Sequence, residues 1–293
     1  MARAEQVRPP AHDMASVQPM LSLLALASSA CWGTSDFFAG LKSKSLPAAA
    51  VVAWSQGLGL LVVSLVVAVR HADLAFEGWP LWSVAAGLAG TTGLVCFYAA
   101  LSSGTMGVVA PVASLGVVVP VLLGLATGEQ PPASAWFGML LAVVGIALAS
   151  GPELSGDVSP RPVALACVAA VGFGFALYCL DRGSRESLLH TLWGMRLTSV
   201  TVFVVAGLAL RTAGGVGRTD VPALFAIGVG DLAANAMFAF ASSRGLVSVA
   251  SVLGSLYPVV TVLLARFVLH ERLKRIQSFG VGLSLVGVAV IAA

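Results

Sequence analysis

The chain has 293 residues, of which 58% are hydrophobic and only 10% are charged, and its mean hydropathy is +0.96. Soluble domains carry roughly 25% charged residues, so this composition excludes a soluble protein. The formal net charge is +3, and the lysines and arginines are scattered over loops rather than clustered. This distribution argues against a nucleic-acid partner.

Apolar residues fall in blocks of about 20, which is the length that crosses a ~30 Å hydrocarbon core as a helix. Backbone amides in lipid must be hydrogen-bonded within the segment, and the alternating pattern of an outer-membrane barrel is absent, so the blocks are predicted to be helices. The fold class predicted is an all-α membrane protein with ten transmembrane helices. The blocks cover residues 21–41, 48–70, 81–102, 108–127, 133–150, 162–180, 188–211, 221–242, 247–269 and 276–293.

The second half of the chain repeats the first at a nearly constant spacing close to half its length, as when Ser114 is matched by Ser255 and Glu129 by Glu271. Each half holds five predicted helices. Because five is odd, the second half enters the membrane from the opposite side, which predicts two inverted five-helix repeats. Such repeats are typical of secondary transporters, whose substrate site lies near the midplane, although duplication for stability alone is the alternative. The predicted organisation is a polar N-terminal tail (1–20), a first repeat (21–150), a linker (151–161) and a second repeat (162–293).

Prolines interrupt two helices that are equivalent in the repeats. Pro111 and Pro120 lie in the block at 108–127, and Pro258 lies in the block at 247–269. A proline inside a span removes a helix hydrogen bond and bends the helix. The three prolines are therefore predicted to form a gate at the repeat interface, with simple curvature as the alternative.

Glycines also mark one face of two equivalent helices. Gly138 and Gly145 are two helical turns apart, as are Gly280 and Gly287. Small residues let helix backbones approach closely in lipid. We expect these faces to pack, either on their own halves or on another subunit, so both a monomer and a homodimer are open.

Two ionisable residues lie deep inside predicted spans, Arg196 and Asp231. Charged groups at this depth are costly unless they face a cavity or a partner. Counting from opposite membrane sides places both near the midplane, so they are a candidate pair. The pair either locks two helices together or takes part in binding substrate or protons, and protons are a candidate coupling ion.

Other polar and aromatic side chains within the spans are candidates for lining a substrate site. Asn235 and Phe238 follow Asp231 at helical spacing, a stripe that suits a metabolite with an ammonium or hydroxyl group and an apolar body. Packing, or a solvated helix end in the case of Asp36, is the alternative. The predicted substrate-binding set is Trp32, Asp36, Gln56, Tyr98, Tyr178, Arg196, Asp231, Asn235, Phe238 and Tyr257.

Metal and cofactor chemistry is not indicated. The cysteines lie inside predicted spans without metal-ligand spacing and are expected to be small core residues. Glu129 and Glu271 sit at helix ends, where a capping or loop-ordering role is expected. We therefore expect no metal and no cofactor.

Several of these features resemble the EamA family of the drug/metabolite transporter (DMT) superfamily. They are Trp32-Gly33 in the first helix, the proline-bearing segment 255–260, and the glutamate that closes the fourth and ninth helices before a Gly-x6-Gly helix. The resemblance covers residues 21–293. The chain departs from the pattern at Val117, which stands opposite Pro258.

The resemblance implies a secondary transporter that exports amino acids, other metabolites or drugs without ATP. It also implies a cavity lined mainly by the first, third, fourth, sixth, eighth and ninth helices, with both termini cytoplasmic. The bias of lysine and arginine between the two sides favours neither orientation firmly.

The function predicted is export of small metabolites, amino acids or related compounds, across the inner membrane by alternating access. Uptake of a sugar or another small solute is the alternative. A membrane-embedded enzyme is disfavoured, because the charged residues between the sixth and seventh helices are typical of an ordinary loop. These residues are Asp181, Arg182, Arg185, Glu186 and His190.

Overall fold

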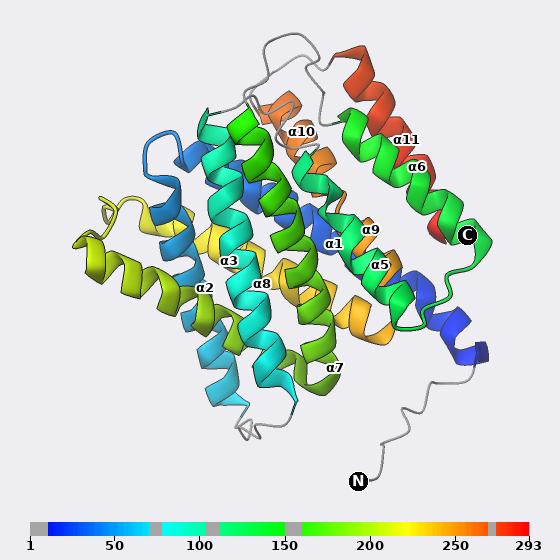
Figure 1. Cartoon of the computed structure of the whole chain (residues 1–293), viewed down its shortest axis with the longest axis horizontal. Helices are drawn as coiled ribbons and strands as arrows, with labels where there is room; N and C mark the ends of the chain where they lie inside the picture. The colour runs from blue at the N-terminus through cyan, green and yellow to red at the C-terminus, as the bar shows by residue number, and fades with distance from the viewer. Residues whose placement is uncertain (1–10, 71–77, 104–111, 150–159, 269–273, 293) are drawn as a thin grey trace.

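The computed structural model describes residues 11–70, 78–103, 112–149, 160–268 and 274–292. These residues form helices and turns, with no β-strand among them, so the all-α prediction is confirmed (Figure 1). The elements are α1 (Ala11–Lys42), α2 (Ala48–Val69), α3 (Trp79–Ser103), the 3-10 turn η1 (Leu115–Val117), α5 (Val118–Ala126), α6 (Ala133–Ala149), α7 (Pro160–Leu210), α8 (Val221–Arg244), α9 (Val247–Gly254), α10 (Tyr257–Val268) and α11 (Arg275–Ala292).

In the described part of the chain, five helical stretches are long and apolar enough to cross a membrane. They are Ala48–Val69, Trp79–Ala100, Pro160–Leu210, Val221–Arg244 and Val247–Val268. Shorter apolar helices accompany them at Val112–Ala126, Ala133–Leu148 and Arg275–Ile291.

The observed helices differ from the predicted blocks in several places, including the fourth block, which is interrupted by η1. α1 begins at Ala11, within the segment predicted as a polar tail. The sixth and seventh blocks run together as α7, which turns sharply at Ser187, where φ is −154° and ψ is 107°. The ninth block is divided into α9 and α10 at Ser255 and Leu256. The turn at Ser187 lies at the end of the gap predicted between the sixth and seventh helices, although the sixth helix extends beyond its apolar block. The division of the ninth block lies just before Pro258, which was predicted to bend this helix.

Equivalent helices of the two halves run antiparallel, as inverted repeats require. α6 and α11 form one such pair at the edge of the molecule (Figure 1). Gly138 packs against the Gly287 carbonyl, 2.8 Å from where a Cβ would stand, while Gly145 packs further along against Gly280. The glycine faces therefore pack on each other across the repeats. The prediction that they pack on their own halves or on another subunit is wrong, because sequence spacing identifies a face but not its partner.

A second contact recurs in both repeats with the same register. Gly33 of α1 packs against Tyr257 at the start of α10, where an added Cβ would lie 2.5 Å from the carbonyl oxygen. Gly174 of α7 packs in the same way against the Gly116 carbonyl of η1. In the repeat register, Gly174 is the equivalent of Gly33, and Gly116 is the equivalent of Tyr257. The two repeats thus share one helix crossing, related by the pseudo-two-fold axis.

We expect Gly174→Ala to lower the free energy of unfolding in detergent by about 1–3 kcal/mol, because the added methyl group must push two backbones apart. Gly40→Ala is the matched control, since nothing lies within 4 Å of its Cβ position inside α1. The control should be neutral or slightly stabilising, as alanine favours a helix over glycine. Equal melting temperatures for the two variants would contradict the close crossing.

One end of the molecule is held by a carboxylate that crosses between the repeats. Glu129, just after α5, accepts hydrogen bonds from the backbone N–H groups of Val247 (2.6 Å) and Ser248 (3.1 Å) at the start of α9. A carboxylate at a helix N-terminus satisfies orphan donors and complements the helix dipole. The expected capping role is therefore seen, but on a helix of the other repeat. Glu271 lies outside the described residues.

The opposite end carries a partly exposed ion pair. Lys42, at the end of α1, donates to Asp220 ahead of α8 at 2.7 Å. This hydrogen bond, with a second from the Gly217 N–H, holds the pKa of Asp220 below its usual value. Pairs of this kind on a solvated surface contribute little to stability.

Candidate functional site

A cavity lies between the two repeats, with a volume of about 980 Å³ including its open mouth. Its walls come from α1, α2, α3, α7 and α8, together with the breaks before α5 and α10. The cavity is open to solvent at its mouth and is lined by side chains from both repeats.

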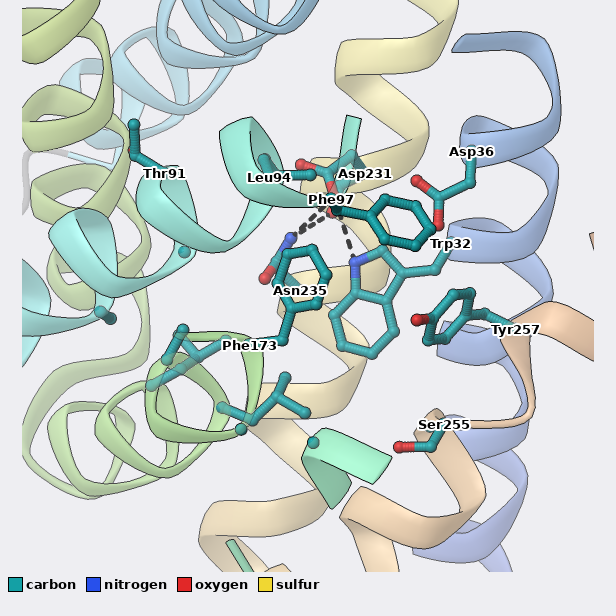
Figure 2. A pocket seen from close by; sticks show the side chains of 18 of the residues that line it. Trp32, Asp36, Thr91, Leu94, Phe97, Phe173, Asp231, Asn235, Ser255 and Tyr257 are labelled. Carbon is teal, nitrogen blue, oxygen red and sulfur yellow. Dashed lines mark hydrogen bonds between the residues drawn. The ribbon is translucent and has the colours of Figure 1, made fainter. Parts of the chain in front are cut away.

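The centre of the polar wall is Asp231 of α8. Its carboxylate accepts hydrogen bonds from Trp32 Nε1 (3.1 Å), Arg196 Nη2 (2.5 Å) and Asn235 Nδ2 (3.3 Å). Arg196 Nη1 also donates to Gln56 Oε1. Figure 2 shows the bonds from Trp32 and Asn235 meeting at Asp231. The network joins α1 and α2 of the first repeat to α7 and α8 of the second.

The predicted pair of Arg196 and Asp231 does meet, and its two members differ in exposure. The Arg196 side chain is 3% exposed, whereas that of Asp231 is 26% exposed toward the cavity. A buried guanidinium requires a counter-charge. Asp231 therefore neutralises Arg196 while still presenting part of its carboxylate to the cavity.

Asp36 lies one helical turn beyond Trp32 on α1 and lines the same cavity. Figure 2 shows its carboxylate on the same side of the cavity as the Trp32 and Tyr257 rings. Within the described part of the chain, no side chain forms an ion pair or a hydrogen bond with this carboxylate. Asp36 is thus a half-buried acidic group in the cavity without a protein partner.

The cavity also has apolar lining residues, called here the apolar wall, and two of them stand at positions equivalent to polar ones. Asp36 of the first repeat is matched by Leu177 in the second, and Asn235 of the second repeat is matched by Leu94 in the first. All four line the cavity. The apolar wall also includes Phe97 of α3, Phe173 of α7 and Val117 of η1. The inverted repeats therefore form a symmetric frame with chemically unlike sides.

Aromatic contacts follow the same symmetry. Trp32 packs on Phe238 with ring centroids 5.7 Å apart, and Phe173 packs on Phe97 at 5.8 Å. The second pair occupies the positions equivalent to the first in the repeat register. Only the indole of the first pair carries a hydrogen-bond donor, so it alone can hold the Asp231 carboxylate.

The model of the EamA-like transporter family matches residues 20–151 and again residues 161–293. The chain belongs to this family. Its members are membrane transporters of small solutes, so the chain is a membrane transporter with a small-molecule substrate. A solved structure titled "Crystal structure of protein" matches with a TM-score of 0.78 at 19% sequence identity, covering 92% of this chain and 96% of that chain. That likeness concerns the fold. No curated protein matches the sequence.

In this EamA-family chain most residues of the predicted substrate-binding set line the cavity. They are Trp32, Asp36, Gln56, Arg196, Asp231, Asn235 and Tyr257. The remaining three lie behind or beyond its walls. Tyr98 is buried in an apolar cluster with Ala113, and Phe238 supports Trp32 from behind. Tyr178 packs edge-on against Trp82, with ring centroids 6.3 Å apart.

The predicted gating prolines border breaks in equivalent helices. Pro258 lies in the first turn of α10, directly after the break that ends α9. Pro120 lies in the first turn of α5, directly after η1. Pro111 lies outside the described residues. A role of these prolines in gating stays a prediction.

The charged residues near the turn in α7 hold helices together. Asp181 is 1% exposed and pairs with Arg185 at 3.0 Å, and Arg185 also donates to the Ser242 carbonyl of α8. His190 accepts or donates one hydrogen bond with Ser187 and stacks on Trp79. No group of three potential metal ligands gathers within the described ranges.

The apolar part of the lining was not predicted, including Leu94, Phe97, Phe173 and Leu177. Such residues look like ordinary lipid-facing or core side chains in a hydrophobic chain. The repeat register was the available signal, since each is the equivalent of a residue that was predicted. Ser114 and Ser255 are equivalent and both line the cavity, but neither was predicted, so the register gave no signal for them.

Proposed function

We propose that this protein is a secondary active transporter that exports small metabolites across the inner membrane by alternating access. The observation that carries the proposal is the cavity, which lies between inverted repeats and is lined by equivalent positions of both. In inverted-repeat transporters, rocking of one repeat against the other exposes a site of this kind to either side in turn.

The repeats proposed to move are residues 21–150 and 162–293. The contact of Glu129 with the start of α9 joins them at one end of the cavity, so this end is proposed to be closed in the present conformation. The movement that opens this end of the cavity must break the contact between Glu129 and α9. The breaks before α5 and α10 supply places where the helices can bend, which supports the proposed gating role of Pro120 and Pro258.

The carboxylates in the cavity make protons a candidate coupling ion in this proposal. Asp231 can change partners only if Arg196 finds another counter-charge, whereas Asp36 can exchange a proton or cation without breaking an ion pair. The described cavity is lined within one chain, so a monomer would be sufficient for transport.

The test is transport by purified protein in liposomes, with a panel of radiolabelled amines, amino acids and sugars. Vesicles are prepared inside-out and right-side-out, since this comparison separates export from uptake. We expect saturable counterflow of at least one solute, which protein-free liposomes lack. A wild-type protein that remains folded but moves no solute faster than empty liposomes would contradict the proposal.

A further inference from the structure

We infer that the cavity selects an organic cation with an apolar body and discriminates against free amino acids. This inference rests on the proposed function, because it names the class of solute for the same cavity. It comes from the unequal walls of the cavity and from the one carboxylate there that the protein leaves unpaired in the described part of the chain.

When both of its carboxyl groups are ionised, the lining of the cavity carries a net negative charge. Asp36 and Asp231 are acidic, and Arg196 is basic. Because Arg196 is paired with Asp231, the remaining charge is that of Asp36. A carboxylate at such depth in a membrane protein is costly without a cation, a proton or water beside it. A cationic solute removes this cost by binding.

The surroundings of Asp36 also suit an ammonium group. Trp32 and Tyr257 line the cavity on the same side, with their rings close to the carboxylate in Figure 2. Aromatic faces attract cations most strongly when the cation is desolvated. The acid and the two rings together provide attraction that a neutral molecule of equal size would not receive.

A free amino acid requires a second partner, because its carboxylate needs donors or a cation. The guanidinium of Arg196 is only 3% exposed, and its charge is already paired with Asp231; Nη1 donates to Gln56 and Nη2 to Asp231. Its Nε is enclosed and has no partner in the described structure. No second basic side chain lines the cavity within the described residues. A carboxylate of the solute would therefore add a negative charge beside Asp36 and Asp231.

The apolar wall completes the recognition. Phe97, Phe173, Leu94 and Leu177 offer apolar surface in the same cavity to a hydrocarbon or aromatic body. A solute bound with its ammonium at Asp36 would lay its apolar part on this wall. The chemical asymmetry of the repeats thus fixes one orientation of the solute.

The experiment measures binding to purified wild-type protein through quenching of tryptophan fluorescence, checked by equilibrium dialysis. The probes share one phenyl group: phenethylamine is cationic at neutral pH, 2-phenylethanol is neutral, phenylalanine is zwitterionic and 3-phenylpropionate is anionic. We expect phenethylamine to bind at least about tenfold more tightly than each of the others, a factor equal to about 1.4 kcal/mol. Equal or tighter binding of phenylalanine would overturn the inference.

Three variants assign the preference to the two walls. Asp36→Asn should remove at least about tenfold of the cation preference, and Asp36→Glu should retain most of it. Phe173→Ala should weaken binding of phenethylamine and 2-phenylethanol alike and leave their ratio unchanged. Asp220→Asn, which lies outside the cavity, should change neither the affinity for phenethylamine nor the affinity for 2-phenylethanol. If folded Asp36→Asn still prefers phenethylamine to 2-phenylethanol, the assignment of this preference to Asp36 is wrong. If Asp36→Asn does not fold, the ratio of the two affinities in Phe173→Ala still shows whether the preference depends on the apolar wall.

Failure of this inference can be told apart from failure of the proposed function. A protein that transports a solute in liposomes but does not prefer phenethylamine disproves the solute class alone. If the protein binds phenethylamine through Asp36 but transports no solute, the transport proposal is wrong and the inference about the binding site still holds.

Discussion

Replacing Asp231 with alanine is expected to lower the free energy of unfolding in detergent micelles by about 3–5 kcal/mol. The change leaves the guanidinium of Arg196, which is only 3% exposed, without its counter-charge. Breaking a buried ion pair from one side costs this much because an uncompensated charge remains. The variant also removes the acceptor of the Trp32 indole N–H. Reversible unfolding in mixed micelles measures the effect.

The matched control is Asp220→Ala, which removes an aspartate just before the same helix from a partly exposed ion pair with Lys42. It should cost less than about 1 kcal/mol. Equal losses in the two variants would contradict the buried network.

A double replacement separates stability from transport. Arg196→Met with Asp231→Leu removes both charges and should regain most of the lost stability, as apolar residues often replace buried ion pairs without loss. If the pair only locks α7 to α8, the double variant also regains transport. If Asp231 takes part in solute binding, the double variant is stable and inactive. We expect the second result, since Asp231 is partly exposed to the cavity.

Replacing Glu129 with alanine is expected to have the second largest effect, a loss of about 2 kcal/mol together with opening of one end of the cavity. The carboxylate accepts two backbone hydrogen bonds at the start of α9, and bonds to a charged group are stronger than neutral ones. Without them the two repeats lose this cross-connection. Glu129→Gln should fall between wild type and alanine, because its amide keeps one acceptor oxygen.

Opening can be followed with a cysteine at Ser248, which is 0% exposed at the start of α9. Labelling of Ser248→Cys by a water-soluble maleimide should be slow in the wild-type background and several-fold faster with Glu129→Ala. Gln130→Ala changes the adjacent exposed residue and should leave the rate unchanged. Unchanged labelling with Glu129→Ala would show that the contact does not hold this end closed.

The fold was predictable because two strong signals agreed. Hydrophobic blocks define helices in lipid, and the repeat register defines which helices are equivalent. Neither signal describes how a helix is interrupted. The gap between the sixth and seventh blocks and the proline at 258 indicated where the turn at Ser187 and the break at Ser255 and Leu256 lie, but not that the sixth helix runs on to the turn or that the ninth block divides into two helices.

The candidate site was predictable only where polarity stood out. Asp231 and Arg196 are conspicuous in an apolar chain, and the antiparallel arrangement brought them to one depth. The rotation of each helix was unknown, so Tyr178 and Phe238 could not be distinguished from lining residues. Conversely, Leu177 gives no signal as a single residue, and its role emerges from being the equivalent of Asp36.

The most direct test of alternating access is the reactivity of one cysteine in the cavity from the two sides of the membrane. Ser255→Cys is introduced after replacing Cys31, Cys96, Cys167 and Cys179 with alanine, since Ser255 lines the cavity. Proteoliposomes of uniform orientation are treated with a membrane-impermeant thiol reagent from outside, or from inside after loading. We expect the cysteine to react with reagent added from either side, in liposomes whose membrane remains impermeable to the reagent. A cysteine that reacts from one side only, with and without solutes that the protein transports, would contradict the account.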